Sequence, residues 1–401
     1  MLSPQEKKVI AGITFAVVAR MLGLFLLLPV LSPYVSTLEG STPVLTGVAV
    51  GIYGLTQALL QIPFGYLSDI YGRKPIITLG FLAYILGSVL GGLAGSVWSM
   101  IIARFLQGAG AISSAAVSLA ADLIREEVRT RAFARIGASV SIVFAISMVV
   151  APLIAAIFGV PFIFYLTASL SFMAMLYILL FIREPAKKRA PSSVSLGALW
   201  HTLGDRGQLV LNASVGVLHS FLVCIFVILP LEFIHTYGFP KEDHWKVYLP
   251  IILLSVAIMV SATAVAERKG RTKEVFLIGI ALIGVGFLIH FFTHTFYGAV
   301  VFLTLYFVGF HLLEPVMPSL LIKLASSETR GMAVGMYNTS QFVGAFIGGL
   351  AGGVFLKVGV PYMLITGFLM SVAWFMGVYF LLSVPSRRKD TDGEERGQKG
   401  S

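Results

Sequence analysis

The chain has 401 residues, of which 57% are hydrophobic and 12% charged, and its mean hydropathy is +0.90. Soluble globular domains carry about 25% charged residues, so this composition excludes an ordinary soluble enzyme or binding module. The net charge of +10 does not indicate a nucleic-acid partner, because the basic residues are spread over many short segments. The single cysteine, Cys224, excludes a disulfide framework. We therefore predict an all-α membrane protein whose surroundings are the lipid bilayer.

Twelve apolar segments are long enough to cross a bilayer, which takes about 20 residues in a helix. The first follows Lys7 and Lys8 and continues past Val30 without a small-residue cleavage site, so we interpret it as a retained helix and not a signal peptide. The predicted helices cover residues 9–35, 44–67, 75–95, 97–122, 133–157, 160–182, 208–233, 247–266, 274–294, 296–322, 332–356 and 361–384.

The lysines and arginines predict the orientation of these helices. Of the 29 basic residues, 24 fall in alternate loops and the termini, 3 fall in the other loops, and 2 lie within helices. Loops rich in Lys and Arg stay in the cytoplasm. Both termini are therefore predicted to be cytoplasmic, in a multi-pass protein of a bacterial inner membrane.

The two halves of the chain repeat each other, which predicts two bundles of six helices. Asp69, Gly72 and Arg73 recur 198 residues later, and Thr130 and Arg131 recur 199 residues later. Such same-direction repeats are typical of transporters that bind substrate between two bundles near the membrane midplane. The predicted parts are an N-terminal bundle (1–182), a cytoplasmic linker (183–207), a C-terminal bundle (208–384) and a disordered tail (385–401).

The segment GYLSDIYGRKP, residues 65–75, is a polar and basic turn between two predicted helices. It resembles the signature loop of the major facilitator superfamily, G-x-x-x-D-[RK]-x-G-[RK]-[RK], with an isoleucine in place of one basic residue. The superfamily resemblance covers essentially the whole chain, and several stretches are similar to the YajR-type bacterial drug/proton antiporters. The matching residues of the loop are Gly65, Asp69, Gly72, Arg73 and Lys74.

The resemblance implies that this loop is part of a gate. In the family the acid and the loop arginine latch helix 2 to helix 11, which assigns gating roles here to Asp69, Arg73 and Arg131. Glu267 and Arg271 are the corresponding residues of the second half. An acid at a helix end can also accept hydrogen bonds from the N-terminus of a neighbouring helix. The alternative is a solvated basic loop that only sets the topology.

Two further motifs refine the resemblance. IIARFLQGAG in the fourth helix is similar to a family motif whose arginine influences proton transfer, which points to Arg104 and Gln107. The fifth helix carries Pro152 of the family's antiporter motif, but every glycine of that motif is another small residue here. The expected fold is the major facilitator fold.

Three charged residues lie well inside predicted helices, away from the helix ends: Arg20, Arg104 and Glu314. Each costs about 2.5–3.5 kcal/mol at a helix centre on insertion scales, so such residues are usually paired and functional. We predict that Glu314 takes up a proton or a cation, with Arg104 or Arg20 as its counter-charge. The alternatives are a structural ion pair for Glu314 and structural arginines bonded to backbone carbonyls.

Polar residues on other helices predict a substrate cavity. Tyr53, Gln57 and Gln61 share one helix face at four-residue spacing. His290 and His294 have the i, i+4 spacing of metal ligands, but no acid or cysteine accompanies them in the sequence, so no metal site is predicted. The further cavity candidates are Gln107, His219, His311, Asn338 and Gln341; for the histidines, core hydrogen bonding is the alternative.

We predict a secondary transporter, not an enzyme, that exports small amphipathic or cationic compounds in exchange for protons by alternating access. It is expected to work as a monomer on a small-molecule substrate, with no cofactor and a proton gradient as its energy source. No G-x-x-x-x-G-K-[ST] sequence indicates ATP use. The alternatives are a metabolite, sugar or siderophore transporter and, more distantly, a lipid-modifying membrane enzyme.

Overall fold

The structure, a computed structural model, describes residues 3–185, 204–325 and 330–383. Within these residues twelve helical segments are long and apolar enough to span a membrane, which confirms the predicted number. The predicted linker lies largely outside the described residues, and the predicted tail lies wholly outside them.

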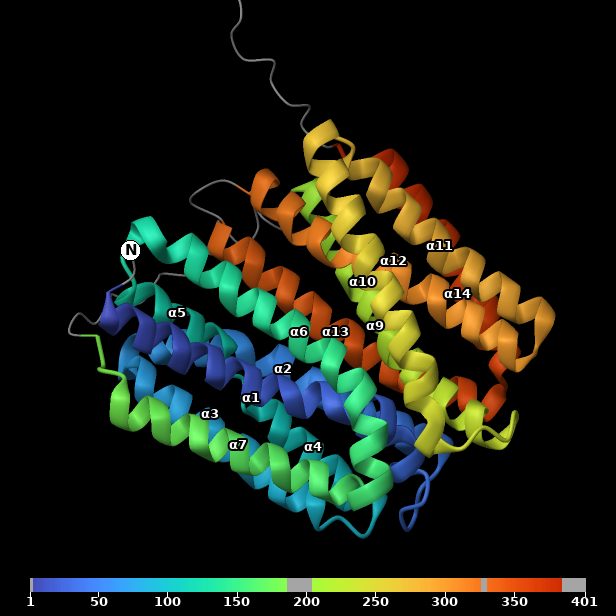
Figure 1. Cartoon of the computed structure of the whole chain (residues 1–401), viewed down its shortest axis with the longest axis horizontal. Coiled ribbons are helices and arrows are strands. Elements are labelled where there is room, and N and C mark those ends of the chain that lie inside the picture. Colours follow the sequence, from blue (N-terminus) through green and yellow to red (C-terminus); the bar gives the residue numbers. More distant parts are fainter. Residues whose placement is uncertain (1–2, 186–203, 326–329, 384–401) are drawn as a thin grey trace, which may run out of the picture.

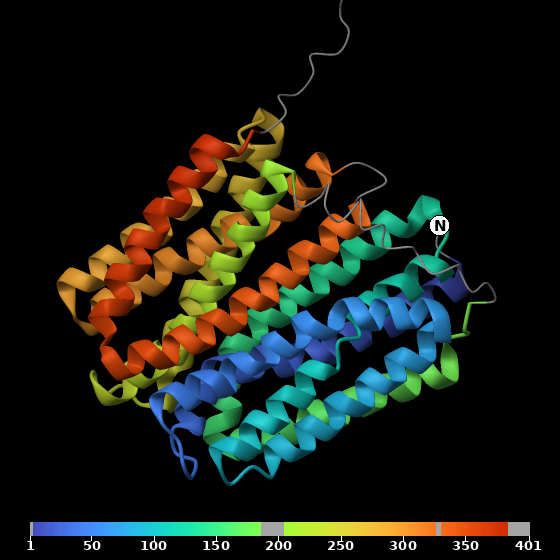
Figure 2. The ribbon, with the colours of Figure 1, turned by 180° about the vertical axis from the view of Figure 1, so that it is seen from behind.

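The helices of the N-terminal half, blue to green in Figure 1, are α1 (Pro4–Val35), α2 (Pro43–Tyr71), α3 (Arg73–Gly92), α4 (Val97–Ala109), α5 (Ser113–Leu123), α6 (Glu126–Phe158) and α7 (Val160–Phe181). Those of the C-terminal half are α9 (Arg206–His235), the short η1 (Lys241–Asp243), α10 (His244–Lys269), α11 (Thr272–Thr293), α12 (Phe296–Leu324), α13 (Arg330–Val358) and α14 (Val360–Leu381). The two halves lie side by side in both views (Figures 1 and 2).

The first helix, α1, begins before its predicted apolar segment because polar residues cap its start. The Ser3 side chain accepts a hydrogen bond from the Glu6 backbone N–H, and the Glu6 side chain accepts one from the Ser3 backbone N–H. This capping box satisfies amides that would otherwise have no partner at the helix start. It extends α1 by five residues beyond its predicted start at residue 9.

The fourth predicted helix, 97–122, is corrected by the structure: it is interrupted between α4 and α5. Gly110 ends α4 with a ψ of 44°, away from helical values. A Cβ at Gly110 would lie 2.8 Å from the Gly80 carbonyl oxygen of α3 and 2.8 Å from Tyr84 Cβ. The glycine allows close packing on α3 at the point where the helix is broken. Apolar composition alone does not reveal such a break.

We name the two ends of the helix array by the chain segments found there. The linker face holds Gly72, Arg125 and Gly270, and the opposite face holds the connections 36–42 and 236–243. On the linker face Lys74 Nζ donates to the carbonyl oxygens of Leu179 and Ile182, at 2.9 and 2.7 Å. This contact ties the start of α3 to the end of α7.

The same contact recurs in the C-terminal half. Lys273 Nζ donates to the carbonyl oxygens of Tyr379 and Leu382, at 2.8 and 2.6 Å, and so ties α11 to the end of α14. The lysines are 199 residues apart and the carbonyls 200. Gly72 and Gly270, which precede the two lysine-bearing helices, both have positive φ. This geometry agrees with the repeat inferred from the sequence.

The two halves meet most closely where α2 crosses α13. A Cβ at Gly349 of α13 would lie 2.6 Å from Gly51 Cα and 2.7 Å from the Gly47 carbonyl oxygen, both in the backbone of α2. Such close backbone approach is possible only between small residues. Towards the linker face, by contrast, a Cβ at Gly331 or Gly335 of α13 would meet no atom within 4 Å. The halves are therefore packed together towards the opposite face and separated along this part of α13.

Candidate functional site

A buried polar cluster in the N-terminal half surrounds Arg20 of α1. Its guanidinium donates to Ser113 Oγ at 2.6 Å, to Tyr53 OH at 2.9 Å and to Gln57 Oε1. Gln57 Nε2 in turn donates to Gln61 Oε1 at 3.3 Å. The predicted stripe on α2 is thus brought together around an arginine of α1 that is only 1% exposed.

Arg104 of α4 also lies against the ring of Tyr53. Its Cζ is 4.8 Å from the centre of the Tyr53 ring, within the range of a cation–π contact. Arg104 Nη1 donates to Gln107 Oε1, and Gln107 Nε2 donates to Ser88 Oγ, both at 2.8 Å. These partners of the two arginines are neutral and belong to the N-terminal half, so the contacts do not make either arginine a counter-charge of Glu314.

Replacing Arg20 with leucine is expected to lower the apparent Tm by several degrees. The change leaves three polar side chains without their buried donor, at a cost of about 2–4 kcal/mol. Thermal unfolding in detergent measures the effect. Arg135→Leu on α6, where the arginine is exposed, is the matched control. Equal Tm values for the two variants would show that Arg20 does not hold this cluster together.

A second cluster, in the C-terminal half, joins Glu314 of α12, His219 of α9 and Gln341 of α13. His219 Nδ1 lies 3.1 Å from the Val215 carbonyl oxygen, which only accepts, so Nδ1 carries a proton. His219 Nε2 faces Gln341 Nε2 at 2.8 Å and Glu314 Oε1 at 3.3 Å. The Glu314 side chain is 35% exposed and His219 is 8% exposed.

This cluster can hold one additional proton. When His219 Nε2 carries no proton, it can accept a hydrogen bond from the Gln341 amide or from a protonated Glu314. When Nε2 is protonated, the imidazolium can pair with the Glu314 carboxylate. The partner of the acid is therefore a histidine and not one of the predicted arginines. Two predicted cavity residues, His219 and Gln341, are found beside Glu314.

Aromatic side chains of α6 and α12 contact each other across the boundary between the halves. The ring of Phe144 in α6 stacks on that of Phe310 in α12, with centroids 5.8 Å apart, and lies 6.1 Å from the ring of His311. His311 Nδ1 donates to the Phe307 carbonyl oxygen, which matches the core-histidine alternative. Asn338 of α13 is half-buried. The polar clusters thus flank an apolar layer.

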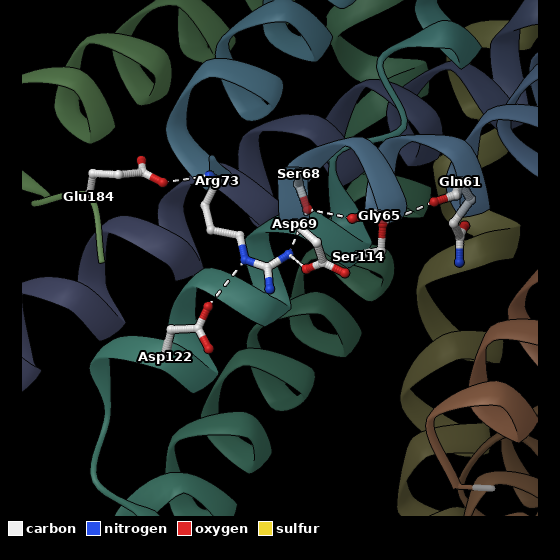
Figure 3. Close-up of polar contacts among 8 residues, drawn as sticks. All are labelled: Gln61, Gly65, Ser68, Asp69, Arg73, Ser114, Asp122 and Glu184. Carbon is white, nitrogen blue, oxygen red and sulfur yellow. Dashed lines mark hydrogen bonds and ion pairs between the residues drawn. The ribbon is translucent and has the colours of Figure 1, made fainter. Parts of the chain in front are cut away.

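The signature loop forms an ion cluster within the N-terminal half on the linker face (Figure 3). The Arg73 guanidinium pairs with Asp69 at 2.5 Å and with Asp122 at 3.1 Å, and donates to Ser68 Oγ at 2.6 Å. The Glu184 carboxylate accepts from the backbone N–H groups of Arg73 and Lys74, at 2.6 and 2.8 Å. An acid at these free amides is favoured by the helix dipole of α3.

Glycine is required at the turn itself. Gly72 has a φ of 105°, and an added Cβ would lie 2.9 Å from Glu184 Oε1. Gly65 lies in α2 with Ser114 Oγ 3.3 Å from where its Cβ would be. Ser114 Oγ also donates to the Gln61 carbonyl oxygen at 3.1 Å, which joins α5 to α2 near the loop (Figure 3).

The other predicted gating residues lie elsewhere. Among the described side chains, Arg271 forms an ion pair with Glu274 at 3.5 Å, and both side chains are 62% exposed. Arg131 is exposed on α6, and Glu267 lies in the last turns of α10. In the described conformation the ion cluster thus belongs to the N-terminal loop. The predicted latch between this loop and the eleventh transmembrane helix, α13, stays a prediction.

Comparisons with known proteins agree with this geometry. The family model of the Major Facilitator Superfamily matches residues 13–266 and 224–400. The chain belongs to the major facilitator superfamily. The Inner membrane transport protein YajR of Escherichia coli (strain K12) is 39% identical over 355 residues, which cover 88% of this chain and 78% of YajR. Multidrug resistance protein 1 of Bacillus subtilis (strain 168) is 26% identical and is covered over 92% of its length, with 88% of this chain matched.

Solved structures of the superfamily share the fold. A mutant of the nucleoside transporter NupG superposes with a TM-score of 0.74 at 14% identity, over 94% of this chain and all of NupG. A D-xylose-proton symporter gives 0.73 at 15% identity, over 94% of this chain and 98% of the symporter. This member of the superfamily is thus a multi-pass membrane transporter and not an enzyme, as predicted.

Two acids that belong to the ion cluster of the loop were missed in the sequence: Asp122 and Glu184. Asp122 and Glu184 lie at the linker-face ends of predicted segments, on the same side as Arg73. The alternation of helix directions in the superfamily fold would have placed them there. The close approach of these acids to one loop depends on how α3, α5 and α7 pack.

Proposed function

We propose that this chain is a secondary transporter that exports small amphipathic or cationic compounds in exchange for protons. The observation that carries this proposal is the carboxylate inside α12, Glu314, with His219 at 3.3 Å and Gln341 on the same imidazole. An acid inside the membrane span is costly and usually functional. This one has a histidine partner suited to proton exchange.

The packing of the halves supports alternating access. They contact each other through glycines of α2 and α13 towards the opposite face, while α13 is open nearer the linker face. The distribution of basic residues assigns the linker face to the cytoplasm. The described conformation would then be closed at the opposite face, with the halves separated along α13 on the cytoplasmic side. The names of YajR and of Multidrug resistance protein 1 support a bacterial inner membrane and a drug-like substrate.

Coupling of proton movement to substrate transport requires two states of the transporter that differ in their affinities for the proton and the substrate. Protonation of Glu314 and binding of a cationic substrate both change the charge of the same cavity, so each disfavours the other. Proton uptake from one side and substrate release to that side would follow from this competition. The ion cluster of Asp69, Arg73 and Asp122 would stabilise the linker-face end of the N-terminal half during the change.

Proton movement in energised inverted vesicles tests the proposal. A pH-sensitive dye reports the gradient while a panel of lipophilic cations and neutral drugs is added. We expect substrate-dependent collapse of the gradient that is absent from vesicles lacking the protein. No response to any compound would contradict drug/proton exchange. A metabolite transporter would then be pursued by ligand-induced thermal stabilisation.

A further inference from the structure

A second carboxylate and histidine pair lies in the C-terminal half, near the opposite face. Glu232 Oε2 of α9 is 3.3 Å from His290 Nε2 of α11, and Glu232 Oε1 accepts a hydrogen bond from Tyr237 OH at 3.0 Å. His290 is fully buried and Glu232 is 8% exposed. The pair is remote from the Glu314 cluster, because 13 residues of α9 separate Glu232 from His219, about 20 Å at 1.5 Å per residue.

The hydrogen bonds of Glu232 and His290 allow the pair to bind one additional proton. His290 Nδ1 has no hydrogen-bond partner within the described residues, so a doubly protonated imidazole would bury an unsatisfied N–H. A neutral His290 with its proton on Nε2 donates to Glu232 and avoids that cost. In this state the buried pair carries one negative charge. Binding a proton neutralises the pair.

Tyr237 acts as a constant donor to the acid. It lies on the connection after α9, and burial together with the Glu232 carboxylate raises the pKa of its hydroxyl. The hydroxyl therefore keeps its proton at physiological pH. Other titratable groups on the surrounding elements include His235 on α9, His294 after α11, Lys241, Glu242 and Asp243 in η1, His244 and Lys246 on α10, Tyr297 on α12 and Lys357 on α13.

A cavity at the boundary between the halves reaches Glu232 of this pair. Its volume is about 320 Å³, and Glu232, His235 and Thr236 line it from the C-terminal half. Ser41, Thr46 and other residues of the α1–α2 connection and the start of α2 line it from the N-terminal half. A cavity of this size can hold water where hydroxyl and carboxylate groups line it. The acid is therefore placed where a proton can be exchanged with water.

We propose that Glu232 and His290 form a second proton-binding site, on the opposite-face side of the transporter. A hydronium ion in the cavity gives its proton to the Glu232 carboxylate, which becomes a neutral acid bonded to His290 and Tyr237. Because the cavity wall comes from both halves, separation of the halves on this face would expose the site. Its part in transport depends on the proposed exchange mechanism, whereas proton binding itself does not.

Infrared difference spectra between acidic and near-neutral pH test the site on the full chain in lipid nanodiscs. A carboxyl group that becomes protonated in an apolar setting gains a C=O stretching band. We expect Glu232→Gln to lose one such band and Glu314→Gln to lose a different one. Glu242→Gln, which removes an exposed acid of the same face, should leave both bands. An unchanged spectrum for Glu232→Gln would overturn the inference while leaving the Glu314 proposal intact.

A second variant separates proton binding from a purely structural role. Tyr237→Phe removes one donor to the carboxylate but keeps the ring. Since a hydrogen bond to a charged group favours that form, the Glu232 band should then appear at a pH higher by about one unit. A band that keeps its midpoint in Tyr237→Phe would contradict the assignment of the band to Glu232.

Discussion

Gly349→Val is expected to reduce transport by about tenfold to a hundredfold. The valine side chain would start 2.6 Å from Gly51 Cα and 2.7 Å from the Gly47 carbonyl oxygen. Backbone atoms cannot move aside as a flexible side chain can, so α2 and α13 must separate. Overpacking of this kind costs about 1–3 kcal/mol, which shifts the balance away from the conformation closed at the opposite face.

Distances between spin labels at Glu39 and Tyr362 measure this shift directly. Both residues are exposed on the opposite face, one in each half. The labels should be farther apart in Gly349→Val. Gly377→Val on α14 is the matched control, because a Cβ there would meet no atom within 4 Å. Wild-type transport and distances in Gly349→Val would show that this crossing is not a closing contact.

Glu314→Gln is expected to abolish accumulation of substrate driven by a pH gradient. For exchange of one proton per substrate cation, with no membrane potential, one pH unit supports about a tenfold substrate gradient. The glutamine cannot take up the proton, so this ratio should fall to about one. Transport into proteoliposomes with an imposed pH gradient measures the ratio for a lipophilic cation.

An exposed acid of the same half provides the control. Glu274→Gln removes a carboxylate that is 62% exposed at the start of α11. It should keep the tenfold ratio. If Glu314→Gln still accumulated substrate as well as Glu274→Gln did, the proton site would have to lie elsewhere, and the Glu232 pair would become the first alternative.

The predicted polar residues are divided between the halves in a way that the sequence does not reveal. Arg20, Arg104 and Glu314 were grouped because each is a charge inside an apolar segment. In the structure both arginines lie against Tyr53 of the N-terminal half, while Glu314 contacts His219 of the C-terminal half. Opposite charge in the sequence was thus a poor guide to pairing, because it carries no information about which helices are neighbours.

Helix ends were the least reliable part of the sequence prediction. An acid near a predicted helix end was assumed to be exposed, although it can be buried. Glu232 was placed at the end of a helix predicted to stop at residue 233, but α9 continues to His235 and buries this acid. His290 and His294 were considered only as a pair of metal ligands. His290 instead meets an acid from a helix 58 residues earlier in the chain. Such a contact becomes visible only after the helices are packed.

The sequence by itself determined the number of helices, the two related halves and the superfamily. Long apolar segments can cross a bilayer only as helices or as a closed barrel, since backbone groups must bond internally, and the loop motif is read directly from residue order. Tertiary structure decided the break between α4 and α5, the acids around Arg73 and the two separate carboxylate and histidine pairs. Lipid-facing and core-facing residues of a membrane helix are equally apolar, so hydropathy does not tell which face meets which neighbour.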